Sequence, residues 1–195
     1  MKGIRTREQI LDQAIRMASI LGLEGLTIGN LARTLHMSKS GLFAHFQSKE
    51  NLQKMVVEAT AERWVHFVFD PALEKARGLE RVQALFEGWL AWENAEFLPG
   101  GCLIMSSAFE FDDRPGEIHD QLVLYQRRLY DTFERAVRLA IDEGDLRVDL
   151  NEKTFVFVWV GLFLAYIHRS RMLEFDDAEQ MLRQGFAALV ERSRA

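Results

Sequence analysis

The sequence predicts an all-α fold, and three observations support this prediction. Apolar residues recur at the i, i+3, i+4 and i+7 spacing of a buried helical stripe in one segment after another. Only three prolines occur among the 195 residues, so few helices need to be interrupted. No run of alternating apolar and polar residues, the pattern of half-buried strands, stands out. With 48% hydrophobic residues, the chain has ample material for a core.

The first helix is predicted to begin at Thr6, because Thr6 and Gln9 have the spacing of a capping box. Its apolar stripe is followed by Gly22, and glycine is a common residue at the end of a helix. We expect this helix to pack across the two helices that follow it. The stripe consists of Ile10, Ala14, Met17, Ala18 and Leu21.

A helix-turn-helix is predicted next. Its first helix follows Thr27, whose hydroxyl can accept a hydrogen bond from an otherwise unpaired backbone N–H. Its second helix follows Ser38 for the same reason and runs over residues 39–46. Leu42 and Phe46 are four residues apart and would bury on the first helix. The stripe of that first helix consists of Ile28, Leu31, Ala32 and Leu35.

The second of these two helices would leave small and polar residues facing outward. Small groups allow a helix to enter a DNA major groove about 12 Å wide, where cations reach base edges or phosphates. A wide apolar face would instead indicate docking to another protein. The outward residues are Lys39, Ser40, Gly41, Ala44 and His45. We therefore predict double-stranded DNA as a partner of this surface.

The charge distribution agrees with DNA binding although the net charge does not. The whole chain carries −5. Residues 1–50 contain seven Lys and Arg and four acidic residues, a net charge of +3, so the remaining residues carry −8. A basic end on an acidic protein suits a chain that meets DNA with that end and keeps the rest away from it.

Eight residues of the helix-turn-helix, with Thr27 ahead of them, stand at fixed offsets: Ala32, Ser38, Gly41, Leu42, Phe43, His45, Phe46 and Lys49. In this arrangement the chain up to about residue 55 resembles the TetR family of bacterial transcriptional repressors. The resemblance implies an N-terminal three-helix DNA-binding domain that is joined by a long helix to a C-terminal helical domain for ligand binding and dimerisation. It also implies a homodimer on a palindromic operator, and it adds Thr27, Phe43 and Lys49 to the residues expected to contact DNA.

Two residues depart from the pattern of that family. His36 stands where a turn glycine is usual, and a histidine costs some stability if the position requires a positive φ. Phe43 stands where a tyrosine is usual, so the hydroxyl that meets a phosphate is missing. Lys39 and Lys49 are then expected to carry more of the affinity for DNA.

The rest of the chain is predicted to be helical without a flexible linker. Ser48 caps a long helix that reaches about Phe69, and Asp70-Pro71 predicts a break. The domain boundary is placed inside this helix, giving a DNA-binding domain of residues 1–50 and a ligand-binding and dimerisation domain of residues 51–195. Further helices are expected over residues 79–94, 102–111, 117–143, 151–173 and 176–192.

The last two helices are predicted to form a dimer interface. Residues 155–167 are all apolar or glycine, but about 20 such residues are needed to cross a bilayer, so no membrane partner is expected. A helix that is apolar on every face needs a second surface to bury it, and a symmetric copy is the simplest source. The expected interface residues are Phe157, Val160, Leu164, Phe186, Leu189 and Val190.

The C-terminal domain holds more aromatic residues than a minimal helical bundle requires. Between helices, such residues line apolar pockets for small molecules. We therefore expect a small hydrophobic or aromatic effector that releases the protein from DNA, and no cofactor. The pocket is predicted to involve Trp64, Phe67, Trp89, Trp92, Cys102, Phe109, Tyr125, Trp159 and His168.

Three alternatives remain open from the sequence. A lone cysteine excludes an intramolecular disulfide and fits a reducing, cytoplasmic location, yet Cys102 could make the protein a redox- or electrophile-sensing regulator. A helical enzyme is not expected, because the chain lacks H-E-x-x-H, G-x-S-x-G, G-x-G-x-x-G and Walker sequences, and no metal site is expected either. A protein-docking module is the third alternative.

Overall fold

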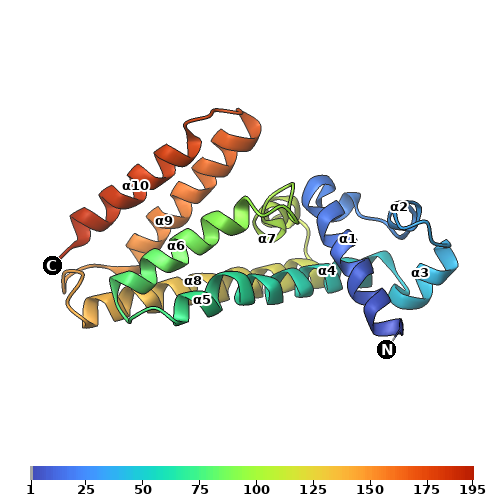
Figure 1. The fold of residues 1–195 in the computed structure, drawn as a ribbon, viewed down its shortest axis with the longest axis horizontal. Coiled ribbons are helices and arrows are strands. Elements are labelled where there is room, and N and C mark those ends of the chain that lie inside the picture. Colours follow the sequence, from blue (N-terminus) through green and yellow to red (C-terminus); the bar gives the residue numbers. More distant parts are fainter. Residues whose placement is uncertain (1) are drawn as a thin grey trace. The chain divides into compact units, whose positions relative to one another are not determined.

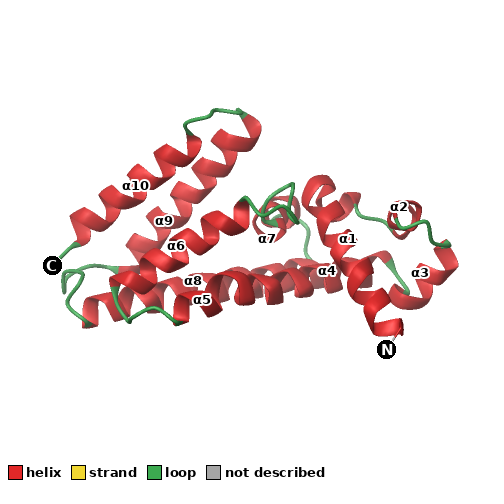
Figure 2. Cartoon of the chain, viewed as in Figure 1, coloured by secondary structure: helices red, strands yellow, loops and turns green. Residues whose placement is uncertain are grey.

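A computed structural model describes the backbone of residues 2–195 and the side chains of residues 7–195. Throughout this part of the chain the regular elements are helices, which confirms the all-α prediction (Figures 1 and 2). The chain divides into two compact units. The first unit comprises Met1–Pro71 and Phe86–Arg128, and the second comprises Ala72–Leu85 and Leu129–Ala195. The functional boundary proposed after residue 50 stays a prediction.

The first unit contains the predicted helix-turn-helix. Its complete helices are α1 (Lys2–Gly25), α2 (Ile28–Thr34), α3 (Lys39–Phe46), α4 (Lys49–Trp64) and α7 (Leu103–Phe111). The N-termini of α3 and α4 are capped as predicted. Ser38 accepts a hydrogen bond from the N–H of Gly41 at 3.1 Å, and Ser48 accepts one from the N–H of Asn51 at 3.0 Å.

The start of α1 differs from the prediction. The helix begins at Lys2, upstream of Thr6, so Thr6 is not its capping residue; the side chain of Thr6 lies outside the described residues. Gly22 interrupts the helix as expected, with φ 74° and ψ 168°, but helical structure resumes until Gly25. The buried stripe also differs, since Ile15 is buried and Leu21 is half exposed.

The predicted break at Asp70-Pro71 is wrong. A π-helical turn, η1 (Val65–Phe69), continues α4 directly into α5 (Asp70–Leu73). Proline within an α-helix clashes with the carbonyl four residues earlier and cannot donate a hydrogen bond to it. The wider π turn relieves this conflict, because the N–H of Asp70 bonds to the carbonyl of Val65, five residues back.

Three helices are divided between the units: α5, α6 (Leu79–Glu93) and α8 (Glu117–Asp142). The second unit ends with α9 (Glu152–Ile167), the π-helical turn η2 (His168–Met172) and α10 (Ala178–Ser193). These bounds agree closely with the predicted ranges. None of the described helices is both long and apolar enough to span a membrane.

The core of the second unit is aromatic. The ring of Trp159 is stacked on that of Phe133, with 4.3 Å between centroids and 11° between planes. Phe155 and Phe186 contact the same indole edge-on or tilted. Because Phe155 and Trp159 come from α9 and Phe186 from α10, this cluster joins the last two helices.

Candidate nucleic-acid interface

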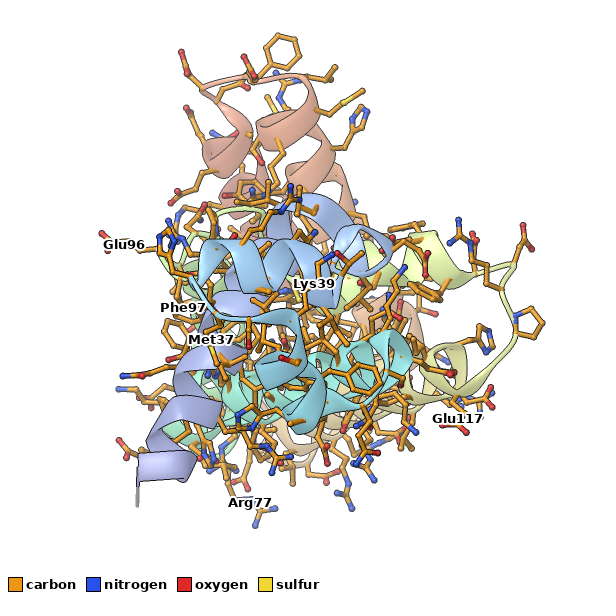
Figure 3. The ribbon with its side chains drawn as sticks, turned by 90° about the vertical axis from the view of Figure 1, so that its right-hand side faces the viewer. Met37, Lys39, Arg77, Glu96, Phe97 and Glu117 are labelled. Carbon is orange, nitrogen blue, oxygen red and sulfur yellow. The ribbon has the colours of Figure 1, made fainter. Side chains whose placement is uncertain are left out.

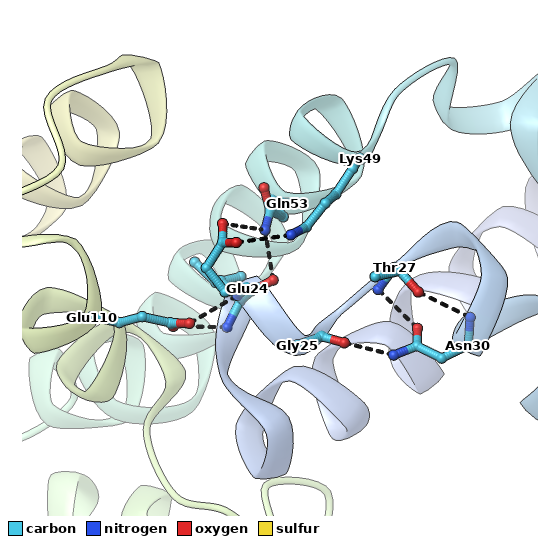
Figure 4. A network of polar contacts seen from close by, with 8 residues as sticks. Glu24, Gly25, Thr27, Asn30, Lys49, Gln53 and Glu110 are labelled. Atoms are coloured by element: carbon cyan, nitrogen blue, oxygen red, sulfur yellow. Dashed lines mark hydrogen bonds and ion pairs between the residues drawn. The ribbon is translucent and has the colours of Figure 1, made fainter.

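The start of α2 is fixed by a reciprocal capping box (Figure 4). The hydroxyl of Thr27 accepts a hydrogen bond from the N–H of Asn30 at 3.1 Å, and Oδ1 of Asn30 accepts one from the N–H of Thr27 at 2.8 Å. The amide nitrogen of Asn30 also donates to the carbonyl of Gly25 at 2.6 Å. The sequence did not indicate Asn30, because the usual capping box has Glu or Gln at that position.

The turn between α2 and α3 requires an unusual backbone conformation. His36 has φ 54°, which lies in the left-handed region. This explains why a glycine is usual at this position in the family that the sequence resembles. The N–H of Met37 donates to the carbonyl of Ala32 at 3.0 Å and closes the turn. Met37 in this turn and Lys39 at the start of α3 are labelled in Figure 3. The turn thereby ends α2 and leads into α3.

The two faces of α3 are as predicted. Leu42 and Phe46 are fully buried against the rest of the first unit. Lys39, Ser40 and Ala44 are exposed. The other expected DNA contacts on this helix are less uniform, since Gly41 and His45 are half-buried and Phe43 is 55% exposed. The outward orientation is confirmed for Lys39, Ser40 and Ala44, and contact with DNA stays a prediction for all six residues.

Lys49 stands at the first turn of α4 and is engaged with an acidic partner. Its Nζ lies 3.0 Å from Oε2 of Glu24 in the last turn of α1. The hydrogen bond from Lys49 is the main cause that lowers the pKa of the Glu24 carboxyl, so this carboxyl stays ionised. Thr27, the remaining expected contact, is half-buried. A phosphate at Lys49 would therefore share or replace the Glu24 carboxylate. Sequence reasoning missed Glu24 because 25 residues separate it from Lys49.

The residues expected to line a ligand pocket are divided between the two units. Trp64, Trp89, Trp92 and Cys102 are buried in the first unit, Phe67 is partly exposed and Tyr125 is half-buried. Phe109 is 65% exposed on α7, and His168 is exposed in the second unit. Trp159 fills the aromatic core of the second unit. The pocket therefore stays a prediction, for which the first unit offers the larger group of residues.

Within the first unit, three rings form an aromatic cluster: Phe67, Trp92 and Phe97. Their centroids are 5.4 to 5.9 Å apart, and every pair meets edge to face. The indole of Trp92 is fully buried, whereas Phe67 and Phe97 are partly exposed. Phe97, which the sequence analysis did not select for the pocket, is labelled in Figure 3. The cluster offers apolar ring surface at the edge of a buried core.

The surroundings of Cys102 argue against a sensing role. The residue is buried just before α7, where its N–H donates to Oε2 of buried Glu93 at 3.0 Å. The other oxygen of that carboxylate accepts a hydrogen bond from the indole N–H of Trp89. Burial and the Glu93 charge raise the pKa of the Cys102 thiol to about 12. Since the thiolate is the reactive form, this thiol is a poor nucleophile in the folded protein.

The expected dimer residues divide into exposed and buried groups. Phe157 is 72% exposed, and Leu164 and Leu189 are half-buried. Val160, Phe186 and Val190 are almost fully buried, and Phe186 contacts the rings of Phe155 and Trp159 on α9. These three therefore belong to the core of their own chain and not to an exposed surface. We define the α9 surface as Phe157, Val158, Gly161 and Leu164, which repeat on one side of the helix.

Comparison with known families matches both parts of the chain. Residues 10–55 match the family described as bacterial regulatory proteins, tetR family. Residues 78–186 match the family described as tetracyclin repressor-like, C-terminal domain. The second match alone spans more than half of the chain.

Individual proteins support the same assignment. The chain is 24% identical to the HTH-type transcriptional regulator SrpR of Pseudomonas putida, over 84% of this chain and 74% of SrpR. A TetR transcriptional regulator from Chloroflexus aurantiacus has the same fold, with a TM-score of 0.84, 23% identity and coverage of 97% and 94%. AibR, solved in complex with isovaleryl coenzyme A and operator DNA, gives a TM-score of 0.73, 20% identity and coverage of 94% and 97%.

Proposed function

Because the chain belongs to the TetR family of bacterial regulatory proteins, and is therefore a DNA-binding transcriptional regulator and not an enzyme, we propose that it is a repressor released by a small effector. As a homodimer it binds a palindromic operator through α3, and effector binding ends that contact. The exposed face of α3 carries the proposal, since Lys39, Ser40 and Ala44 make it small, polar and cationic. The residues proposed to contact DNA are Thr27, Lys39, Ser40, Gly41, Phe43, Ala44, His45 and Lys49.

The homodimer follows from the size of the DNA-binding surface and from the α9 surface. A single eight-residue helix buries too little area for tight specific binding, whereas two copies related by a twofold axis read two half-sites about one helical turn apart. Phe157 and Val158 expose apolar area on α9, and Met181 does so on α10. Burying these side chains against a second copy is favourable by about 25 cal/mol for each Å² removed from water.

The effector is proposed to be small and hydrophobic or aromatic. The partly exposed rings of the aromatic cluster favour apolar, flat molecules, which gain from edge-to-face contact with such rings. AibR, which shares the fold, was solved in complex with isovaleryl coenzyme A and operator DNA. An effector releases DNA only if it binds the DNA-free conformation more tightly, and a coupling of about 1–3 kcal/mol weakens operator binding roughly 5- to 150-fold.

Selection of bound duplexes from random DNA tests this function. The expected product is an inverted repeat whose half-sites are about one helical turn apart. Titration of the selected duplex should then show two chains bound to each operator. Enrichment of a single unsymmetrical site, or of no sequence at all, would contradict the proposal.

The effector is tested separately, with a panel of aromatic and acyl compounds. A compound that raises the melting temperature of the free protein should also release the selected duplex in a fluorescence anisotropy assay. A stabilising compound that leaves the duplex bound would contradict effector control.

A further inference from the structure

We infer that Glu110 of α7 is a positioning residue for DNA binding, which holds the turn from which α2 and Lys49 take their positions. The turn consists of Leu23, Glu24 and Gly25 at the end of α1, and all contacts in question lie within the first unit. The inference rests on the proposed function in one respect, namely that α3 and Lys49 contact DNA.

The turn depends on a side chain that is distant in sequence. Gly22 leaves the helical conformation, so the N–H groups that follow it lose acceptors within α1. The N–H of Leu23 donates to Oε2 of Glu110 at 2.9 Å, and the N–H of Glu24 donates to Oε1 at 2.9 Å (Figure 4). The Glu110 carboxylate thus caps the last turn of α1 with both oxygens, and hydrogen bonds to a charged acceptor are stronger than neutral ones.

Gly22 serves this contact in two ways. Its φ of 74° lies in the left-handed region, which favours glycine. A Cβ atom at this position would also lie 2.9 Å and 3.0 Å from the two carboxylate oxygens of Glu110. A side chain here would therefore require the Glu110 carboxylate to shift from the position in which it accepts from the two N–H groups. The break in α1 and the acid on α7 therefore form one structural unit.

The segment leading into α7 is attached to α1 at other points as well. Nη1 of Arg16 donates to the carbonyl of Glu96 at 2.7 Å, and the N–H of Gly100 donates to the hydroxyl of Ser19 at 3.2 Å. A Cβ atom on Gly100 would lie 1.6 Å from the carbonyl oxygen of Ser19, so the two backbones are in direct contact. Glu110 extends this line of contacts to the very end of α1.

Each residue of the turn makes a contact with α4 or with the residues that cap α2. The carbonyl of Leu23 accepts a hydrogen bond at 2.6 Å from Nε2 of Gln53, a buried side chain on α4. The carboxylate of Glu24 pairs with Lys49 at the start of α4. The carbonyl of Gly25 accepts from Asn30, the residue that caps α2 together with Thr27. Movement of the turn would therefore displace α2 and, through Gln53, the first turns of α4.

Loss of the Glu110 contacts should reduce the fraction of molecules in which α2, α3 and Lys49 are correctly placed to bind DNA. The apparent Kd rises in proportion to the inverse of that fraction, although the bound complex is unchanged. The same phosphates are contacted in the complex, so the salt dependence of binding should not change. A residue that touches DNA would alter both quantities. This difference distinguishes positioning from direct contact.

The first experiment requires no DNA. Glu110→Gln keeps the size of the side chain but replaces one acceptor oxygen with a donor NH2 group, so one N–H loses its partner. Hydrogen exchange in the segment of residues 23–30 should become at least about tenfold faster, while exchange in α9 and α10 is unchanged. The matched control is Asp113→Asn, which removes the same charge from an exposed position just after α7. Unchanged exchange in Glu110→Gln would overturn the inference.

The second experiment uses the duplex selected from random DNA. Glu110→Gln should raise its apparent Kd about 3- to 10-fold at an unchanged salt slope, with every protein molecule still active in a stoichiometric titration. Gly22→Ala should raise the apparent Kd by a similar factor. The double variant should have an apparent Kd no higher than that of the weaker-binding single variant, because both changes break the same contact. Faster exchange with an unchanged Kd, a lower salt slope or fully additive effects would each overturn positioning.

The two experiments also separate this inference from the proposed function. If the unaltered protein bound no duplex, the proposed function would fail and, with it, the role of Glu110 in DNA binding. The exchange data would then still report whether Glu110 holds the turn. If the unaltered protein bound its duplex and Glu110→Gln bound it equally well, only the inference about Glu110 would fail.

Discussion

Two exposed helix faces of this protein differ in the chemistry that they present. The outward face of α3 carries Lys39, Ser40 and Ala44, while the α9 surface carries Phe157 and Val158 around Gly161. The first face is cationic and narrow, which suits a polyanion with a groove. The second is apolar, which suits another apolar surface such as that of a copy. In the proposed function both faces are contact surfaces, and the residue types on each determine its partner.

The largest effect is expected from charging the α9 surface. Phe157→Glu places a carboxylate in the proposed dimer interface, so the protein should become monomeric and lose operator affinity by about 10²- to 10⁴-fold, because only one copy of α3 can then engage. Light scattering and operator titration measure the two losses.

The control for this variant is Val148→Glu, which charges an apolar residue that is 89% exposed outside the α9 surface. It should leave both the dimer and operator binding intact. If the Phe157→Glu variant remained dimeric, the α9 surface would not be the dimer interface. The comparison between the α3 face and the α9 surface would then hold for the α3 face alone.

A smaller effect is expected on the α3 face. Lys39→Ala should weaken binding of the selected operator about 5- to 150-fold, as expected for one specific base contact of about 1–3 kcal/mol. Random duplex should be affected much less. Lys75→Ala, which removes an exposed lysine of the second unit, is the control and should change neither. An equal loss on both duplexes would assign Lys39 to phosphate contact.

Lys49 should show the opposite pattern. Lys49→Ala should weaken operator and random duplex alike and reduce the slope of log K against log salt by about 0.9, the value for one phosphate contact. Glu24→Gln should shift affinity the other way by a few-fold, because the exposed ion pair that competes with phosphate is worth about 0.2–1 kcal/mol. Salt titrations of both variants measure this. If Glu24→Gln weakened binding, the competition with phosphate would be disproved.

The smallest effect concerns the turn that aims α3. His36→Gly should raise the free energy of unfolding by about 0.5–1 kcal/mol, because glycine adopts φ 54° without the steric cost that a side chain brings. Urea titration measures the change. Arg33→Gly, in the right-handed helix α2, should instead lower stability by a similar amount. Destabilisation by His36→Gly would show that the imidazole makes a contact worth more than its backbone strain.

Local features of the sequence predicted local structure well. The bounds of α3 were found because Ser38 caps its start and the buried pair Leu42 and Phe46 lies within it. The rule that failed was also local. Pro71 was expected to end a helix, but the preceding π turn absorbs it, and nothing in a single sequence marks such a turn.

Contacts between distant residues could not be predicted. Glu24 meets Lys49 across 25 residues, and Glu110 meets the N–H of Leu23 across 87. The exposed face of α9 was also hidden, because a helix that is apolar on every side gives no period from which to choose. Val160 was therefore selected together with Phe157, although it is buried in its own chain. Val160→Glu would accordingly test folding and not dimerisation.

The uninterrupted course from Ser48 to Leu73 restricts how chimaeric regulators can be built from this protein. Since α4, η1 and α5 follow one another without a loop, one residue inserted at a junction would rotate everything beyond it by about 100° and advance it by about 1.5 Å. A foreign DNA-reading module must therefore be joined in helical phase, in steps of about seven residues or two turns. Grafts that ignore this phase would turn their recognition helices in the wrong direction and separate α1 from Glu110 of α7.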